Sequence, residues 1–479
     1  MTKAKSRVEH LLEALRAGEH LSSASELELV LRLAFPALLA QISVVLMQYI
    51  DASMVGHLGA GESAAVGLVS SSIWLFWGIS GASIAGFSVQ AAHRIGARDF
   101  DAAKSLLRQA ITTILIFSSI LALVGWYIHR DLPMWLGGDI SIAENASDYF
   151  VILVGFLPLV LMNWMAGSFL RASGDMKTPS YLGILMCVLD VIFNWLLIFP
   201  TREVTYFGLT FTAPGAGMGV AGAAWGTVIA EAITALLMLW VLIIRSPILR
   251  LAGTTGSFVP RKATLKRALS IAAPIGAERI LMCGAQIIST IIVAPLGVVA
   301  IAAHSLAITA ESLCYMPGYG ISEAATTLVG QSIGAKRKEL ARSLAVKCVS
   351  SGMLVMTLMG VLLWWGAPAL MGVMTDVPEV INLGAQILRI EAWAEPMFAA
   401  AIVCHGVFVG AGDTLIPAIM NLTCFWLVRL SAAFFLAPVW GLAGVWIAMS
   451  GELMIRGAAF LVRLRSDAWL RRGQKLQEG

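Results

Sequence analysis

Long apolar runs alternate with short polar segments along most of this chain. Each run has more than 20 residues, and about 20 apolar residues in a helix cross the roughly 30 Å hydrocarbon layer of a bilayer. The runs predict twelve membrane-spanning helices, at 29–56, 64–90, 106–128, 147–170, 179–200, 219–244, 266–294, 300–328, 343–367, 383–409, 415–437 and 441–463. We therefore expect an all-α membrane protein. The polar, helix-prone residues before Leu29 carry no signal-peptide pattern, so the first run is expected to stay in the chain.

Composition supports the same class of protein. Hydrophobic residues make up 58% of the chain and charged residues only 13%, whereas soluble proteins carry about 25% charged residues. The six cysteines form no C-x-x-C motif and most lie inside apolar runs. They are interpreted as small buried side chains rather than metal ligands or disulfide partners.

Basic residues gather in alternate loops, which predicts the orientation of the helices. They follow spans 2, 6 and 8 and occupy both ends of the chain, at Arg94, Arg98, Lys104, Arg108, Arg245, Arg250, Arg261, Lys262, Lys266, Arg267, Lys336, Arg337, Lys338, Arg342, Lys3, Lys5, Arg7, Arg471, Arg472 and Lys475. The opposite loops hold little beyond Arg130 and Arg202. Both termini are therefore expected in the cytoplasm, which fits an even number of spans.

The two halves of the chain repeat one another. Pro36 and Pro274 are related by an offset of 238 (274 − 36), which also carries Ile95–Arg98 onto Ile333–Lys336 and Gly174-Asp175 onto Gly412-Asp413. Further on, Gly219-x-Ala221-Gly222 matches Gly441-x-Ala443-Gly444 at an offset of 222 (441 − 219). The first half therefore contains about 16 extra residues (238 − 222), expected as an external loop.

Six spans in each half return the chain to the same side, so both halves should insert in the same orientation. We expect two six-helix lobes related by a pseudo-two-fold axis along the membrane normal, with a central cavity between them. A duplication without a cavity is the alternative. The predicted units are a cytoplasmic segment 1–28, a first lobe 29–244, a linker 245–265, a second lobe 266–464 and a cytoplasmic tail 465–479.

Several motifs resemble the multidrug and toxic compound extrusion (MATE) family over roughly residues 29–464. The strongest is IAAHSLAITAESLCYMPGYGISEAATTLVGQSIGAKRKELAR at 301–342. Asp51-x-x-Met54-Val55-Gly56-His57-Leu58-Gly59, and Gly412-Asp413-Thr414 with Pro417, are also similar to the family. The resemblance implies two six-helix lobes and export by alternating access, driven by inward H+ or Na+.

Four polar residues in the spans of the first half are candidates for binding the coupling ion. Asp51 lies late in span 1, Asp190 and Asn194 share one face of span 5, and Thr227 lies in span 6. Buried ionisable groups in a membrane are costly and usually have a partner or a function. These oxygens would suit a small cation or a proton; hydrogen bonds that only lock the helices are the alternative.

The resemblance to the MATE family supports this assignment, with one departure. It implies a first-lobe cation site with an acid in span 1, an Asn/Asp pair four residues apart in span 5 and a nearby threonine in span 6. The order expected in span 5 is Asn then Asp, whereas this chain has Asp190 then Asn194. The exchange leaves H+ and Na+ both open as the coupling ion.

The second half has intramembrane acids of its own. Glu278, Glu311 and Glu395 are candidates for a second coupling site or for substrate contact, and Glu323, Glu391 and Glu452 also lie in spans. Some members of the resembling family carry coupling acids in spans 7 and 10. The alternative is a set of buried ion pairs with Arg279, Arg429 and Arg456 that fixes helix packing.

Other patterns narrow the function. Gly217-x-Gly219-x-x-Gly222 follows no strand pattern and is interpreted as close helix packing, not as a dinucleotide site. The chain has no Walker A motif and no nucleophile–base or metal constellation, so we expect neither an ATP-driven pump nor an enzyme. Trp74, Trp77, Met162 and Trp164 are candidates for the wall of a substrate cavity.

These observations predict a secondary antiporter that exports organic, often cationic, amphipathic compounds in exchange for H+ or Na+. A lipid-linked oligosaccharide flippase of the same superfamily and a passive channel are the alternatives. No cofactor is expected beyond the coupling ion, and the expected partners are membrane lipids and small organic cations, with no nucleic acid. We expect a monomer in a plasma membrane, with a bacterial inner membrane as its setting.

Overall fold

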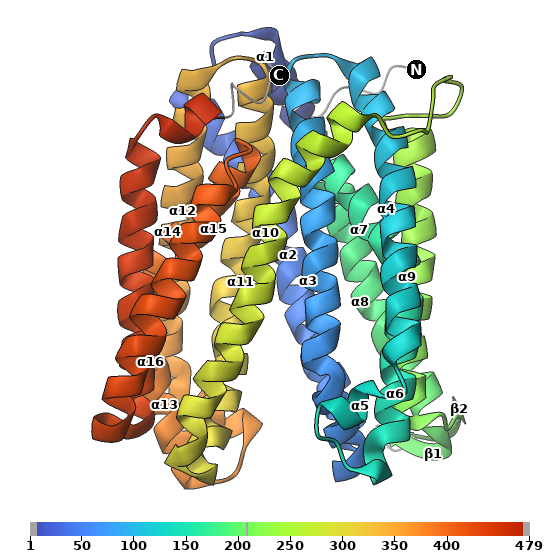
Figure 1. Cartoon of the computed structure of the whole chain (residues 1–479), viewed down its shortest axis with the longest axis vertical. Coiled ribbons are helices and arrows are strands. Elements are labelled where there is room, and N and C mark those ends of the chain that lie inside the picture. The colour runs from blue at the N-terminus through green and yellow to red at the C-terminus, as the bar shows by residue number, and fades with distance from the viewer. Residues whose placement is uncertain (1–6, 207–208, 473–479) are drawn as a thin grey trace.

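The computed structural model describes residues 7–206 and 209–472 as a bundle of helices (Figure 1). The first half contains α1 (Arg7–Ala17), α2 (Ser23–Gly56), α3 (Ala60–Gly96), α4 (Phe100–Ile128), α5 (Leu132–Trp135), α6 (Ile140–Gly155), α7 (Leu157–Ala172), α8 (Lys177–Ile198), β1 (Pro200–Tyr206), β2 (Leu209–Ala216), α9 (Gly219–Trp240) and η1 (Val241–Arg245). The second half contains α10 (Lys262–Val293), η2 (Ala294–Leu296), α11 (Val298–Gly334), α12 (Lys338–Met374), α13 (Pro378–Ala392), α14 (Glu395–Gly410), α15 (Leu415–Thr423), η3 (Cys424–Leu430) and α16 (Ser431–Arg465).

The helices are long and apolar enough for a multi-pass membrane protein. Within the described ranges nine helical segments could each cross a membrane, and two bent pairs, α6–α7 at 46° and α13–α14 at 60°, raise the number to eleven. One segment, Leu415–Arg465, has 51 residues, about 76 Å at 1.5 Å per residue, which is enough for two crossings. It breaks at Gly441, whose φ is 58° and ψ −140°, giving the twelve predicted spans.

The backbone confirms the internal repeat at the predicted offsets. Arg98 and Lys336 are the two non-glycine residues with positive φ in the described chain, at 60° and 58°, and they are related by the same offset (336 − 98). Gly174 and Gly412 repeat the pattern at this offset. The α6–α7 and α13–α14 bends precede Pro158 and Pro396, which again share it (396 − 158).

The later, shorter offset is confirmed as well. Gly219 and Gly441 both have positive φ, at 56° and 58°, and they are the pair that defines this offset (441 − 219). Positive φ is readily adopted only by glycine, so these positions mark matching turns in the two halves.

The extra residues of the first half that the structure describes lie in two paired strands of a β-hairpin, where the sequence indicated only a loop. β1 pairs antiparallel with β2, from Pro200 opposite Ala216 to Tyr206 opposite Leu209, with an irregularity beside Arg202. Threonine, valine and aromatic residues are frequent in both strands, and such residues favour extended backbone. The hairpin lies at the opposite end of the molecule from α1 (Figure 1). We call the end that carries β1 and β2 the hairpin end, and the end that carries α1 the basic end.

The halves form two lobes that pack reciprocally. α3 of the first lobe packs on α10 of the second, and α2 of the first packs on α11 of the second. Because α2 and α3 are the equivalents of α10 and α11 in the repeat, this exchange is what a two-fold relation requires. Outward-facing side chains are large and apolar, as at Leu123, Trp126, Leu362, Trp365 and Phe435, and suit contact with lipid.

The lobes touch at the basic end. His93 Nε2 of α3 lies 2.8 Å from the carbonyl oxygen of Gly410 on α14. Gln331 Nε2 of α11 donates to the carbonyl oxygen of Ala172 on α7 at 2.7 Å. Gly96 and Gly334 have no room for a Cβ, because the backbones of α3 and α11 meet there. The two lobes are therefore closely joined at this end.

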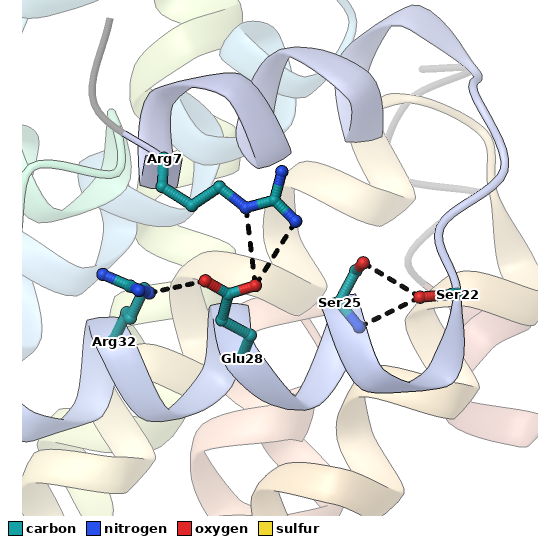
Figure 2. Close-up of polar contacts among 5 residues, drawn as sticks. All are labelled: Arg7, Ser22, Ser25, Glu28 and Arg32. Carbon is teal, nitrogen blue, oxygen red and sulfur yellow. Dashed lines mark hydrogen bonds and ion pairs between the residues drawn. The ribbon is translucent and has the colours of Figure 1, made fainter.

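The amphipathic helix α1 lies across the basic end. Its apolar residues Leu11, Leu12 and Leu15 are buried. Arg7 Nε lies 3.4 Å from Glu28 Oε2 on α2, and Arg32 Nε lies 2.8 Å from the other oxygen of the same carboxylate (Figure 2). Ser22 caps α2 by accepting a hydrogen bond from the Ser25 N–H at 3.2 Å (Figure 2). Lys3, Lys5 and Lys475, used above to predict orientation, lie outside the described residues.

Candidate functional site

The four candidates of the first lobe gather around one amide. Asn194 Nδ2 donates to Asp51 Oδ1 and to Asp190 Oδ2, at 3.0 Å each. α8 packs against both α2 and α9, so it carries Asp190 and Asn194 to Asp51 on one side and Thr227 on the other. Asp51 and Thr227 lie close enough to Asp190 for their side chains to interact with it, and the Thr227 hydroxyl donates to the carbonyl oxygen of Ala223 at 3.2 Å. The structure thus brings together all four residues that the sequence indicated.

The site is buried and retains unused oxygen atoms. Asp190 and Asn194 have essentially no exposed surface. Asp190 Oδ1 and Asn194 Oδ1 are buried without a hydrogen-bond partner in the described structure. Buried acceptors without a donor are unfavourable. The free oxygens fit a proton or a small cation bound among the carboxyl groups, because both supply the missing positive partner.

Two glycines allow α9 to approach α8. A Cβ on Gly226 would meet the Asn194 side chain and lie 2.9 Å from its backbone nitrogen. A Cβ on Gly222 would lie 2.6 Å from the carbonyl oxygen of Leu197. The G-x-G-x-x-G stretch therefore ends in a helix-packing contact, as the sequence indicated, and Gly226 also sets the position of Asn194.

A cavity of about 490 Å³ adjoins this group of side chains. Thr227 belongs both to the polar cluster and to the cavity wall. The wall also includes Trp74, Trp77 and Trp164, as expected. Trp77 contacts Trp74 and Trp164 edge to face, with ring centroids 5.4 and 6.0 Å apart. The fourth candidate, Met162, was wrong: it is buried in the apolar core formed with α3 and α4 and is absent from the wall.

Sequence reasoning missed a second polar cluster in this lobe. Glu231 on α9 accepts a hydrogen bond from Asn163 Nδ2 of α7 at 2.6 Å, and Asn163 Nδ2 also lies 3.3 Å from Thr234 Oγ1. Both Glu231 and Asn163 line the cavity. The signal was present, since Glu231 is an acid in an apolar span, four residues after Thr227 and so on the same helix face.

The acids of the second lobe separate into two places. Glu278 Oε1 accepts a hydrogen bond from Asn421 Nδ2 at 2.7 Å, and Glu278 Oε2 lies 3.7 Å from His405 Nε2. Glu395 is ten residues before His405 on α14, about 15 Å along the helix. The structure therefore does not bring Glu278 and Glu395 together. The sequence did not indicate His405 or Asn421 as partners of Glu278.

Glu311 and Glu395 belong to the second of these places. Glu311 lines a smaller cavity of about 220 Å³, and neither carboxyl oxygen of the fully buried Glu395 accepts a hydrogen bond within the described residues. Glu391 nearby accepts one from Ser450 at 2.6 Å. Arg429 and Arg456 instead bind Glu452, at 2.8 and 3.0 Å. The ion-pair alternative thus applies to Glu452 and leaves the other three acids without a bound arginine in the part of the chain that the structure describes.

Two six-helix lobes, a reciprocal interface and a cavity against buried acids describe a multi-pass membrane protein with the architecture of a transporter. A family model described as MatE matches residues 36–196 and again 274–435. The two matches begin at the repeat offset (274 − 36) and together cover more than half of the chain. The chain belongs to the MatE family, which confirms the resemblance drawn from its motifs.

Curated relatives match over nearly the whole length. The chain is 25% identical to the "Probable multidrug resistance protein NorM" of Thermotoga maritima over 452 residues, which is 94% of each protein. It is 27% identical to the protein of the same name from Pseudomonas aeruginosa, over 89% of this chain and 87% of that one.

Solved structures show the same fold. One, described as the outward-facing conformation of a multidrug resistance MATE family transporter, has a TM-score of 0.86 at 19% identity and covers both chains completely. The Vibrio cholerae MATE transporter VcmN in its bent form has a TM-score of 0.82 at 19% identity, over 95% of this chain and 99% of that one.

Proposed function

We propose that this protein is a secondary antiporter that exports organic, often cationic, amphipathic compounds in exchange for inward H+ or Na+. The observation that carries the proposal is the meeting of two features at Thr227. This residue belongs both to the buried Asp51–Asp190–Asn194 cluster and to the wall of the 490 Å³ cavity. An ion bound in the cluster can therefore affect a compound bound in the cavity.

Coupling would follow from how the cluster is built. Asp51, Asp190 and Thr227 lie on three different helices, so binding a proton or Na+ among them draws α2, α8 and α9 together. These same helices supply much of the cavity wall. A small change in their packing would alter the shape of the cavity and release the compound, in the manner of two ligands that favour different conformations.

The charges of the cavity favour a cationic substrate over a lipid-linked oligosaccharide. Its wall contains two acids, Glu231 and Glu323. The one basic side chain of the described wall, Arg171, lies 3.5 Å from Glu323 and is thereby neutralised. A pyrophosphate group would require free cationic donors, which the described wall does not offer. The relatives' designation as probable multidrug resistance proteins supports the same substrate class.

The coupling claim is tested in liposomes. Purified protein would be reconstituted with a fluorescent organic cation inside or outside, and a pH gradient and a Na+ gradient would be imposed separately. We expect uphill movement driven by one of the two gradients and its loss in Asp51→Asn. Asp101→Asn, which changes an almost fully exposed acid in a loop-proximal turn, is the control and should transport normally.

Two results would overturn the proposal. Gradient-driven transport at the normal rate in Asp51→Asn would remove the cluster from coupling. Absence of any uphill movement under either gradient in the unaltered protein would remove antiport, and binding of lipid-linked saccharides would then be measured for the flippase alternative.

Several further assignments belong to the same proposal. We place the protein as a monomer in a bacterial inner membrane, with the basic end and both termini in the cytoplasm. The chain would divide into the segments 1–28, 29–244, 245–265, 266–464 and 465–479 introduced above. The support is the concentration of basic residues at the end that carries α1, in line with the positive-inside rule.

A further inference from the structure

One buried acid of the cavity has no positively charged partner. Glu231 is only 5% exposed, yet it forms no ion pair with any lysine, arginine or histidine among the described residues. Its hydrogen-bonding neighbours are neutral, because Asn163 donates to it at 2.6 Å and the side chain of Trp164 also interacts with it. The charged group that also acts electrostatically with it is another acid, Asp190. A buried carboxylate that lacks a cation is unfavourable, and a cationic ligand would supply one.

The surroundings of Glu231 suit such a ligand. The Asn163 Oδ1 atom, from a side chain 7% exposed, is a buried acceptor without a hydrogen-bond partner in the described structure, and the side chain of Trp77 adds an aromatic ring to the same wall. Both residues line the cavity beside Glu231. Trp77 and Trp164 present aromatic rings there, 6.0 Å apart between centroids. Aromatic faces attract organic cations, most strongly when water is excluded.

The second acid of the cavity differs in this respect. Glu323 comes from α11 of the other lobe and already has Arg171 at 3.5 Å. Removing its charge would leave that arginine unpaired. The cavity therefore contains one carboxylate that is already compensated and one that is not, which makes the two acids a matched pair for an experiment.

Glu231 lies outside the Asp51–Asp190–Asn194–Thr227 cluster, although it is near enough to Asp190 for the two carboxyl groups to interact electrostatically. It lies four residues beyond Thr227 on α9, about 6 Å nearer the basic end. We propose that Glu231 binds the positively charged group of the transported compound, with Trp77 and Trp164 contacting its aromatic or apolar surface. This inference rests on the proposed function and assigns a separate residue to substrate charge, while Asp51 and Asp190 hold the coupling ion.

The experiment measures binding without any gradient. Tetraphenylphosphonium and tetraphenylborate have nearly the same shape and opposite charge, so their affinities for the purified full-length protein report charge selectivity. We expect the unaltered protein to prefer the phosphonium. Glu231→Gln should weaken phosphonium binding by about tenfold or more, because one partner of a buried charge pair is lost. Glu231→Asp, which keeps the charge, should restore most of it.

Comparison variants separate a local effect from a general one. Glu323→Gln removes one negative charge from the same wall, so a loss as large as that in Glu231→Gln would show that only net cavity charge matters and would overturn the proposal. Unchanged phosphonium affinity in Glu231→Gln would overturn it too. Glu231→Gln could lose binding because it unfolds at a lower temperature. In that case Glu231→Asp decides, since it keeps the charge: loss of phosphonium binding in a well-folded Glu231→Asp protein would contradict the assignment.

The outcome for the proposed function is read separately. If Glu231→Gln binds the phosphonium normally while Asp51→Asn loses gradient-driven transport, the antiporter stands and the assignment of Glu231 fails. If the unaltered protein binds the phosphonium no better than the borate, the cationic substrate class fails together with the role of Glu231.

Discussion

At the scale of single residues, the amide of Asn194 organises the ion cluster. It donates to carboxyl groups from two helices, at 3.0 Å each. Residues four apart on a helix share a face, so the exchange of Asp and Asn relative to the family order keeps both groups in the same cluster. The sequence could predict that these side chains meet. It could not predict which oxygens remain free, because this depends on the separation of α8 and α9.

That separation depends on Gly226, which gives a first prediction at this scale. Gly226→Ala places a Cβ against the Asn194 side chain and 2.9 Å from its backbone nitrogen. We expect a loss of about 1–3 kcal/mol of stability from overpacking and loss of gradient-driven transport. Thermal unfolding and liposome transport measure the two effects.

The control is a helix glycine that has open space around it. Gly451 on α16 has no atom within 4 Å of a built Cβ, so Gly451→Ala should leave transport intact and, through its better helix propensity, stability unchanged or raised. Equal behaviour of the two alanine variants would contradict the packing argument for Gly226.

Glu231 was not predicted as a site residue from the sequence. The rule that led to Asp51 and Asp190, an ionisable side chain inside an apolar run, applies to it equally. What the sequence could not supply was Asn163, which lies 68 residues earlier (231 − 163) and meets Glu231 only because α7 packs on α9. Likewise Met162 belongs to the same helix as Trp164 but faces the core, since neighbouring residues on a helix point in different directions.

At the scale of elements, helix α1 connects the two lobes. Its buried leucines belong to one apolar cluster with Met176 of the first lobe and with Leu328 and Ile333 of the second. Arg16 Nη2 donates to the carbonyl oxygen of Ser173 at 2.7 Å, and Arg16 Nε donates to Gln331 Oε1 at 3.0 Å. Burial lowers the pKa of Arg16 to about 10, so it remains charged at neutral pH. The helix thus favours the arrangement in which the basic end is closed.

Arg16 provides a prediction for this element. Arg16→Ala removes hydrogen bonds to both lobes, and we expect a larger fraction of molecules to open at the basic end. A cysteine introduced at Ser88, which lines a small cavity between the lobes near this end, would then react faster with a membrane-impermeant thiol reagent.

Arg32→Ala is the matched control for Arg16→Ala. Arg32 pairs with Glu28 of its own helix (Figure 2). Its replacement by alanine should therefore leave the reaction rate of the introduced cysteine unchanged. Equal rates in the Arg16 variant and the unaltered protein would show that α1 does not stabilise the closed end.

The sequence could predict α1 as a helix-prone segment but not its docking. Its leucine spacing indicates one apolar face, and any apolar surface, including lipid, could cover that face. The β-hairpin was missed for a related reason: β1 and β2 are short, and their pairing depends on the ends of α8 and α9 lying close together. The twelve spans were easier to predict, because bilayer thickness alone fixes their length.

At the scale of the whole molecule, the two lobes share one fold but differ in the positions of their buried acids. The Asp51–Asn194 and Glu278–Asn421 contacts each join the first and fifth spans of a lobe, and each covers 143 residues. Subtracting the repeat offset places Glu278 at the level of residue 40 (278 − 238), eleven residues before Asp51. At 1.5 Å per residue, the second contact lies about 16 Å nearer the basic end. The two lobes therefore place the equivalent acid–asparagine contact at different heights along the direction from the hairpin end to the basic end.

The closed basic end is the feature that alternating access must reverse. Besides the contacts of α3 with α11 and α14, Lys347 of α12 lies 2.5 Å from Glu26 of α2, with both side chains largely buried. Separating the two partners of such an ion pair is unfavourable, because each leaves a charge in a largely buried position without its partner. Opening this end breaks several such links at once, so the lobes should move as units and separate along the interfaces of α3 with α10 and of α2 with α11.

A cross-link between the lobes tests that motion. A Cβ built on Gly276 of α10 lies 3.8 Å from the Cβ of Ala82 on α3, which matches the usual separation in a disulfide. In the double variant Ala82→Cys/Gly276→Cys we expect oxidation to stop transport, because the lobes can no longer separate, and reductant to restore it. Phosphonium binding should persist in the oxidised protein, since the cavity remains in the conformation described here. Each single-cysteine variant controls for the substitutions, and unchanged transport after complete oxidation would show that export proceeds without separation of α3 from α10.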